Sequence, residues 1–211
     1  MSNFNLYIDA RSLYNNVLDG KNIYAREIIT ALKKSQPSNV SLYLIGDQPS
    51  LDFDYVFQRL WHYHTAKLIN NDSNAIFFSP TSYLTTCLVK RPCVVTVHDL
   101  IALKYPQRVS IKAALIENLC LRILRMKKNV RYLTVSEATK YVLASFFHGN
   151  DSNIHLSSIG CDINVKPLKK QKYILCLQAL HTRKNQELLI KAFSKIHAVI
   201  DWDLYLAGYA D

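Results

Sequence analysis

The sequence has few of the patterns that identify a function directly. Its five cysteines show no CxxC spacing, so neither a zinc ribbon nor a dithiol motif is indicated. GxGxxG and GxxxxGK[ST] are both absent, which removes two common phosphate-binding loops. No RNA-binding, zinc-finger or helix-turn-helix signature and no long-period repeat is present. Function therefore has to be sought in smaller groups of residues.

Targeting segments are also missing from this sequence. Its start, MSNFNLYIDARS, lacks the basic segment and apolar core of a signal peptide. No apolar run reaches the length of a membrane span. Cysteines set in apolar runs, such as Cys93 and Cys120, are typical of small buried residues in a reducing compartment. We predict a cytoplasmic protein, with peripheral contact at the inner face of the membrane left open.

Acidic residues are scarce relative to basic ones. The chain has 26 Lys and Arg against 16 Asp and Glu, a formal net charge of +10. A net positive charge favours anionic partners: nucleotide phosphates, an acidic membrane face or nucleic acid. Because no nucleic-acid-binding signature accompanies the charge, we expect one of the first two rather than nucleic acid.

Short apolar runs alternate with segments of helical periodicity along most of the chain. This alternation predicts an α/β fold, with a Rossmann-like parallel sheet flanked by helices. One helix or two short ones are expected over 53–69, and a long loop is expected from the end of the 94–97 strand through Pro106. The predicted strands of this first domain are 6–9, 42–45, 75–78, 94–97, 132–135 and 154–159.

A change of composition marks the predicted domain boundary. Residues 161–172 are polar and rich in lysine, and we interpret them as a linker after an N-terminal domain, 1–160. The strand-helix pattern restarts over 173–211, an incomplete second Rossmann-like unit with a helix expected over 186–199. So short a unit is expected to pack on the first domain, to dimerise or to fray.

The stretch 93–100, CVVTVHDL, organises the prediction of a site. Its four successive β-branched residues predict a strand buried on both faces of a parallel sheet. Ligands of open α/β sheets bind beyond the carboxyl ends of the strands, where His98 and Asp99 would lie. His98 is a candidate general base or hydrogen-bond donor, and Asp99 could orient it or cap the next segment. Composition alone favours a structural histidine, whereas its position favours function.

A basic turn is the second candidate site. Arg183 and Lys184 stand before a predicted helix N-terminus, with Asn185 as a candidate cap. Unpaired N–H groups and the helix dipole favour an anion there, and two cations suit a diphosphate. A solvated basic turn is the alternative interpretation.

Two further loops supply candidate binding residues. Gly20 and Lys21 open the first predicted helix, where a glycine allows a phosphate to approach the backbone closely. A simple turn is the alternative, since one glycine is a weak signal. Ser136 is predicted to cap the helix that begins near Glu137.

Two DxD sequences, 52–54 and 201–203, resemble a metal–diphosphate signature but do not follow predicted strands. We interpret them as caps and turns. The histidines of His62-Tyr63-His64 would point apart on a helix. No metal site is therefore predicted.

The segment 111–126 predicts the most apolar helix. Ala114, Leu115, Leu119, Ile123 and Met126 share one face, which we expect to pack on the sheet. A helix lying on a membrane surface is the alternative. The basic residues at its end are Arg122, Arg125, Lys127 and Lys128.

Several stretches together resemble the family 4 retaining glycosyltransferases, which have two facing Rossmann-like domains (the GT-B architecture). They are FFSPTS, VVTVHDL, TVSEATKYVL, SIGCDINVKP, YILCLQALHTRKNQELLIKAF and LYLAG, in family order. The resemblance implies transfer of a hexose from a nucleotide-sugar to a glycan or lipid-linked acceptor, with retention and with neither metal nor cofactor. The N-terminal domain would hold the acceptor, and the second unit would begin the nucleotide-sugar-binding domain.

The resemblance also implies roles for the candidate residues. Lys184 and Arg183 would stabilise the leaving diphosphate, where charge develops in the transition state. His98 would lie near the acceptor and the transferring sugar. Gly20 and Lys21 would lie near the acceptor or the diphosphate. Asp99 and Ser136 complete the predicted substrate-binding set.

The sequence departs from the family pattern at several points. The glycine pair of the first loop is reduced to Gly20, Leu177 or Gln178 replaces the glycine of the donor motif, and Ile159 stands where the family has asparagine. The family's paired-glutamate motif is not reached. We therefore predict a truncated glycosyltransferase with impaired turnover. The alternatives are a non-catalytic half-enzyme that binds a partner chain or itself, and a basic nucleotide- or nucleic-acid-binding α/β protein.

Overall fold

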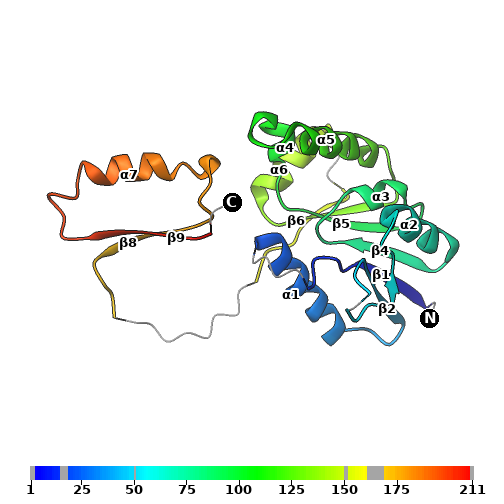
Figure 1. Ribbon diagram of the computed structural model, residues 1–211. Coiled ribbons are helices and arrows are strands. Elements are labelled where there is room, and N and C mark those ends of the chain that lie inside the picture. The colour runs from blue at the N-terminus through cyan, green and yellow to red at the C-terminus, as the bar shows by residue number, and fades with distance from the viewer. Residues whose placement is uncertain (1–2, 15–18, 50, 150–151, 161–168, 210–211) are drawn as a thin grey trace. The chain divides into compact units, whose positions relative to one another are not determined.

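The structure is a computed structural model that describes residues 3–14, 19–49, 51–149, 152–160 and 169–209 (Figure 1). The chain divides into two compact units, Met1–Gly160 and Cys161–Asp211, called unit 1 and unit 2 below. The predicted linker, 161–172, lies outside the described residues as far as position 168.

Unit 1 is built around a parallel sheet of seven strands in the order β3-β2-β1-β4-β5-β6-β7. Helices connect most of the strands and flank the sheet (Figure 1). The predicted Rossmann-like α/β fold is therefore confirmed. The strands are β1 (Phe4–Asp9), β2 (Val40–Gly46), β3 (Tyr55–Val56), β4 (Ala75–Ser79), β5 (Cys93–Val97), β6 (Val130–Thr134) and β7 (Ile154–Leu156).

The helices of unit 1 differ widely in length. Their bounds are α1 (Gly20–Lys34), α2 (Trp61–Asn71), α3 (Leu84–Leu88), α4 (Ile101–Lys104), the 3-10 turn η1 (Pro106–Arg108), α5 (Ile111–Arg125) and α6 (Glu137–Phe146).

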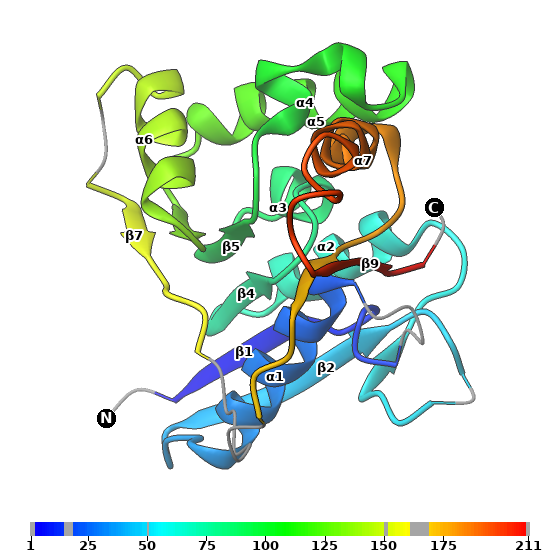
Figure 2. The same cartoon turned by 90° about the vertical axis from the view of Figure 1, so that its left-hand side faces the viewer.

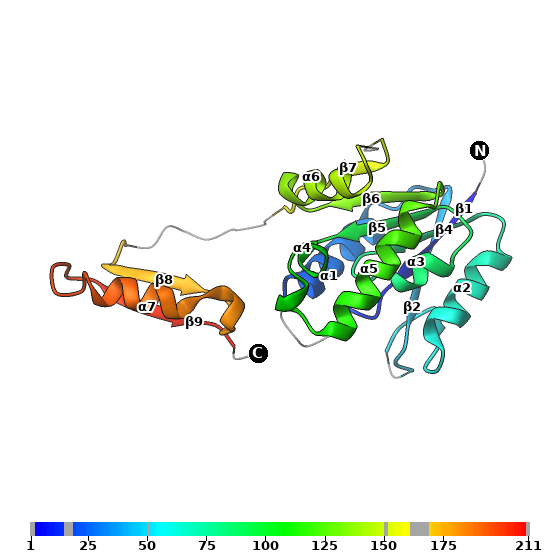
Figure 3. The same ribbon diagram turned by 90° about the horizontal axis from the view of Figure 1, so that it is seen from above.

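Apolar residues fill both faces of the sheet because successive strand residues point to opposite sides. Phe77 and Val95 belong to a large core cluster with residues of α2, α5 and α6. Their neighbours Phe78 and Val94 belong to a smaller cluster with Ile29 of α1. Figure 2 shows α1 lying across β1 and β2, and Figure 3 shows α5, α3 and α2 along the other face.

The predicted organising strand is confirmed as β5. It pairs with β4 on one side and with β6 on the other. Val95 and Val97 are fully buried, and Cys93 and Thr96 nearly so. Strand β5 is thus a rigid support, and the residues that follow it lie at the carboxyl edge of the sheet.

Two predictions about connecting segments were wrong. The stretch through Pro106, expected to be a loop, contains α4 and the start of η1. The Asp99 carboxylate accepts a hydrogen bond from Ile101 N (3.2 Å) and starts the helical turn of α4. The helix expected over 53–69 begins only at Trp61. Before it, Asp54 accepts a hydrogen bond from Leu44 N (2.7 Å) and ties the chain to the edge of the sheet as an extended segment.

The packing face of α5 also differs from the prediction. Its buried residues are Ala114, Cys120, Leu121 and Leu124. Of the predicted face, only Ala114 is buried, whereas Leu115, Leu119 and Met126 are exposed. The helix is apolar on more than one side, so periodicity alone could not select the side that packs on the sheet.

Unit 2 is a strand-helix-strand arrangement. Strand β8 (Tyr173–Leu177) pairs in parallel with β9 (Asp203–Ala207), and the turn η2 (Thr182–Lys184) and helix α7 (Gln186–Ser194) connect them. Gly208 follows β9 because a Cβ there would overlap the carbonyl oxygen of Gln178. None of the described residues of 169–209 is buried, so unit 2 encloses no core within its described part.

Candidate functional site

The carboxyl edge of the sheet in unit 1 collects polar residues. The strand order reverses between β1 and β4, and ligands of open α/β sheets bind at such a switch point. Asp9 ends β1, Ser79 ends β4, and His98 follows β5 directly. This edge is therefore the candidate functional site.

His98 is held in one orientation by two contacts. Its ring meets the ring of Tyr24 edge-on, with centroids 4.9 Å apart. Its Nε2 lies 2.8 Å from the carbonyl oxygen of Pro80. A carbonyl only accepts, so Nε2 carries the proton and donates, which leaves Nδ1 of the neutral ring as an acceptor. His98 can therefore receive a proton or a hydrogen bond through Nδ1.

The protonation of His98 follows from its surroundings. Burial lowers the pKa of His98, against the raising effect of the hydrogen bond to Pro80, and the Lys21 ammonium lowers it further. Asp99 and Asp19 act in the opposite direction. The ring is thus expected to be neutral near neutral pH, as a general base must be before it acts.

Lys21 and Asp99 meet at the same edge although they come from different elements. Lys21 Nζ of α1 lies 3.8 Å from Asp99 Oδ2, and the two side chains are 51% and 43% exposed. An ion pair this open to solvent contributes little stability. Either charge can therefore turn to a ligand at small energetic cost.

The first turn of α1 is already capped. The Asp19 carboxylate accepts a hydrogen bond from Asn22 N (2.7 Å), and helix α1 begins at Gly20. Apart from its chain neighbours and the backbone of its own helix, no heavy atom of the described residues lies within 4 Å of a Cβ built on Gly20. The space is open, but a carboxylate at the helix N-terminus competes with an anionic ligand. This loop consequently fits a hydroxyl-rich ligand better than a phosphate.

Ser136 caps α6, as predicted. Its Oγ accepts a hydrogen bond from Thr139 N (3.1 Å) and lies 2.9 Å from Thr139 Oγ1. The Thr139 hydroxyl donates to the carbonyl oxygen of His98 (3.3 Å), so Ser136 Oγ–H is the donor to Thr139. Ser136 therefore helps to position the backbone at the end of β5.

Glu117 of α5 was not identified from the sequence. It is half-buried, and burial raises the pKa of its carboxyl, with Lys21 lowering it and Asp99 raising it. Burial also raises the pKa of the neighbouring Tyr83 hydroxyl, and Glu117 and Asp99 add to that shift. A carboxyl with a raised pKa beside charged groups is a candidate for proton exchange. One signal was present: Glu117 is the sole acidic residue in 111–128.

The switch point itself contains an ion pair that sequence patterns did not reveal. Arg11 donates to Asp9 from Nε (3.0 Å) and Nη2 (2.9 Å), and its guanidinium stacks 3.6 Å from the ring centroid of Trp61. Nearby, the hydroxyls of Ser12 and Thr81 lie 3.3 Å apart and join the ends of β1 and β4. These contacts fix the loop that borders the candidate site.

A small cavity opens beside Asp99. Its volume is about 150 Å³, and its wall is mainly apolar. Complete small-molecule pockets usually enclose about 300–1,000 Å³, so this cavity is a partial site. The lining residues are Asp99, Leu100, Ile101, Lys104, Tyr105, Ala138, Thr139 and Val142.

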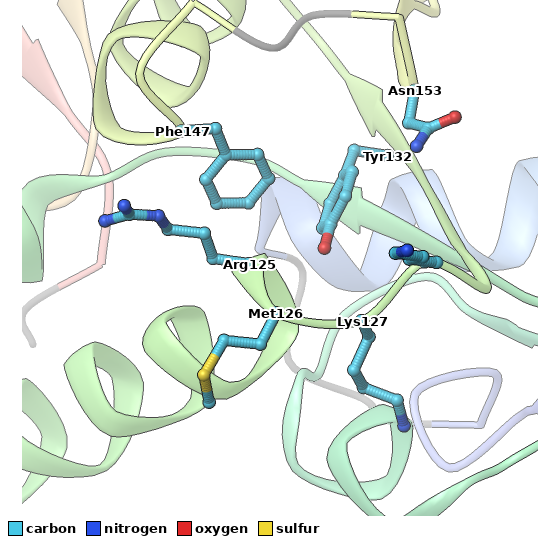
Figure 4. Close-up of a pocket in the computed structure, with 7 residues that line it drawn as sticks. Arg125, Met126, Lys127, Tyr132, Phe147 and Asn153 are labelled. Carbon is cyan, nitrogen blue, oxygen red and sulfur yellow. The ribbon is translucent and has the colours of Figure 1, made fainter.

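A second cavity, of about 550 Å³, lies at the amino-terminal edge of the sheet (Figure 4). Arg125, Lys127, Tyr132 and Asn153 are among its lining residues. The Lys127 ammonium is committed to the carbonyls at the end of α3, Thr86 (2.8 Å), Cys87 (3.1 Å) and Val89. This cavity is thus separate from the edge that carries His98.

Unit 2 contains the predicted basic turn. Lys184 lies in η2 and is exposed, whereas the side chain of Arg183 lies outside the described part of the structure. The predicted cap was wrong: Asn185 adopts a left-handed conformation (φ 56°) without a side-chain cap bond. Instead, Gln186 Nε2 donates to the carbonyl oxygen of Ala179 (2.7 Å) and holds the turn. The predicted role of Lys184 toward a diphosphate stays a prediction.

Comparison with models of protein families gave no match, and neither did comparison with curated proteins. Among the described residues, no group of three or more His, Cys, Asp or Glu side chains is placed to hold a metal ion. None of the described helices is both long enough and apolar enough to cross a membrane. The site therefore has to be interpreted from its own chemistry.

Proposed function

We propose that the carboxyl edge of unit 1 binds a sugar acceptor and that the chain is a glycosyltransferase-like protein. The reaction would transfer a hexose from a nucleotide-sugar to a glycan or lipid-linked acceptor, with retention. The observation that carries this proposal is the convergence of His98, Asp99 and Lys21 at one edge of the sheet, beside a shallow cavity. The resemblance of the sequence stretches to family 4 enzymes supports the same class.

The chemistry of this edge suits a neutral sugar. Each sugar hydroxyl both donates and accepts, and the edge offers carboxylates as acceptors, Lys21 as a donor and His98 Nδ1 as an acceptor. Asp99 pairs with Lys21, and Asp19 and Asp99 both act on His98, so carboxylates oppose the positive charge of Lys21 at this edge. An anionic donor substrate is expected instead at the basic turn around Lys184, because the carboxylate in the first turn of α7, Glu187, is paired with Lys191.

These charges suggest separate roles for His98 and Lys184 in the proposed reaction. His98, neutral and with Nδ1 accepting, would take a proton from an acceptor hydroxyl. Lys184 would stabilise the charge that develops on the diphosphate as the bond between sugar and phosphate breaks. Neither role calls for a metal ion or an organic cofactor.

Isothermal titration of the full 211-residue chain with nucleoside diphosphates and nucleotide-sugars tests the proposal. We expect saturable binding that weakens at least about tenfold in Lys184→Ala, the loss of one charge-assisted contact. The matched control is Lys195→Ala, an exposed lysine just beyond α7, which should bind as the parent does. Absence of saturable binding, or tight binding to DNA or RNA alone, would contradict the proposal.

A second candidate function is a non-catalytic subunit that is completed by a partner chain. It rests on one observation: no described residue of 169–209 is buried, although β8, β9 and α7 carry many large apolar side chains. Sedimentation equilibrium distinguishes it from the first, because a completing partner or second copy would shift the mass above that of one chain. A strictly monomeric chain that binds nucleotide-sugars would favour the first candidate.

A further inference from the structure

Helix α5 exposes a row of large apolar side chains to solvent. The exposed fractions are 79% for Ile111, 66% for Leu115, 60% for Leu119 and 77% for Met126. Spacings of four and seven residues place these side chains on one side of a helix. Scattered exposed leucines are ordinary, whereas a contiguous apolar face on a soluble unit marks an interaction surface. We call these four residues the α5 face.

The α5 face is not needed for the core of unit 1. The helix packs on the sheet through Leu121 and Leu124, which are fully buried, and through Ala114 and Cys120. These residues lie on the side opposite to the α5 face. Figure 3 shows α5 along the outside of unit 1, with the sheet on its inner side.

Basic residues border the α5 face. Four exposed cations lie along the helix and just beyond it: Lys112, Arg122, Arg125 and Lys128. The one acidic residue of the segment, Glu117, is half-buried and couples to Lys21 and Asp99 of the candidate site instead. The outward side of α5 therefore combines apolar side chains with positive charge and carries no exposed carboxylate.

The positive charge around the α5 face favours one of the partners that could cover it. In a symmetric contact with a second copy, the four cations would meet their own equivalents, and like charges would repel. Unit 2 is no better match, because lysines and arginines also outnumber acidic residues within 169–209. An anionic lipid surface complements both properties, since it offers negative headgroups and an apolar interior.

We propose that α5 is an interfacial helix that docks unit 1 on anionic phospholipid bilayers. Ile111, Leu115, Leu119 and Met126 enter the boundary between headgroups and acyl chains, and the bordering cations bind the headgroup phosphates. The helix lies in the plane of the interface and does not span the bilayer. An acceptor with a lipid anchor would then be presented to unit 1 at the surface where that anchor resides.

The cavity at the end of α5 fits this arrangement. Arg125 and Met126 line it together with Lys128, so the last turn of the α5 face adjoins a space of about 550 Å³ (Figure 4). Lys127 also lines this cavity, but its ammonium is held by carbonyls at the end of α3. A phosphate headgroup entering there would meet Arg125 and Lys128 rather than Lys127.

Flotation of the full chain with vesicles tests the proposal. We expect binding to vesicles of phosphatidylglycerol and phosphatidylcholine, much weaker binding to phosphatidylcholine alone, and weakening by salt. Leu115→Gln/Leu119→Gln should lower partitioning by about tenfold or more for each leucine withdrawn from the bilayer. Arg122→Gln/Arg125→Gln should lower it by about fivefold for each charge.

Matched controls separate docking from general effects. Tyr63→Gln/Tyr141→Gln removes two exposed apolar side chains of unit 1 outside α5, with exposed fractions of 55% and 76%. Lys33→Gln/Lys34→Gln removes two exposed charges at the end of α1. Both controls should bind anionic vesicles as the parent chain does. Since all these positions are exposed, urea unfolding should show equal stability for every variant.

A spectroscopic variant gives an independent measurement. The emission of the added tryptophan is obtained by subtracting the spectrum of the parent chain from that of the variant. This emission should shift to the blue on anionic vesicles in Leu119→Trp, whereas it should not shift in Tyr141→Trp. Equal flotation of parent and Leu115→Gln/Leu119→Gln would overturn the proposal, as would equal binding to neutral and anionic vesicles. Self-association that is abolished by the leucine substitutions, without vesicle binding, would assign the α5 face to a second copy instead and also overturn it.

Discussion

Replacing Arg11 by methionine should destabilise unit 1 substantially. The Asp9 carboxylate is 1% exposed and receives two charge-assisted hydrogen bonds from Arg11. Breaking a buried ion pair by removing one partner costs about 3–5 kcal/mol, because the other charge is left without compensation. The Arg11 side chain is 25% exposed, so water would reach part of the stranded carboxylate. We therefore expect a loss of about 2–3 kcal/mol.

Arg11→Met removes the positive charge but keeps most of the packing against Trp61. Methionine keeps an apolar stem over the ring of Trp61, where the Arg11 guanidinium now stacks at 3.6 Å. Asp9→Asn in the same background removes the charge that arginine compensates. The double variant should therefore be more stable than the sum of the two single losses predicts, by about 1 kcal/mol or more.

Urea unfolding followed by tryptophan emission measures these differences. The sequence has two tryptophans, so Trp202→Phe leaves Trp61 as a reporter of unit 1 alone. The control is Arg26→Met, an arginine 44% exposed in α1, which should cost under about 0.5 kcal/mol. A loss in Arg11→Met no larger than in this control, or strictly additive effects with Asp9→Asn, would refute the reasoning.

Three further predictions concern the contacts around the site. Burial lowers the pKa of both His98 and His62, so the unfolded chain binds protons more readily below the ordinary histidine pKa. The free energy of unfolding should therefore fall as pH decreases from about 7 to about 5, and less steeply in a His62→Gln/His98→Gln variant. Ser136→Ala should lower the unfolding free energy by about 1 kcal/mol through loss of the α6 cap, measured by urea unfolding, and an unchanged midpoint would contradict the capping role. Lys127→Met leaves carbonyls at the end of α3 without their donor, and should cost about 1–3 kcal/mol by the same measurement; a smaller loss would mean that water replaces the ammonium.

The strand pattern of unit 1 could be predicted because buried parallel strands carry a strong local signal. The β-branched run that became β5 is an example, and its polar end correctly indicated the edge where His98, Asp99 and Lys21 meet. The same logic failed for α4, whose single turn depends on the Asp99 carboxylate rather than on apolar periodicity.

Other features depend on contacts between distant parts of the sequence. Glu117 reaches the site from α5, and Arg11 stacks on the ring of Trp61, which is far from it in the sequence, so neither contact has a local signature. The side of α5 that packs inward depends on the shape of the sheet beneath it. When a helix is apolar on two sides, the periodicity of its sequence does not show which side packs on the sheet.

The carboxyl edge of unit 1 as a sugar-binding site is tested most directly by mapping amide chemical shifts of the full chain during titration. The titrants are nucleotide-sugars and free hexosides, added separately. We predict perturbations at Gly20, Lys21, His98 and Asp99 with the hexosides, and additional ones around Lys184 with the nucleotide-sugars. Perturbations confined to the opposite edge, around Asn153, or none at saturating sugar, would contradict the assignment.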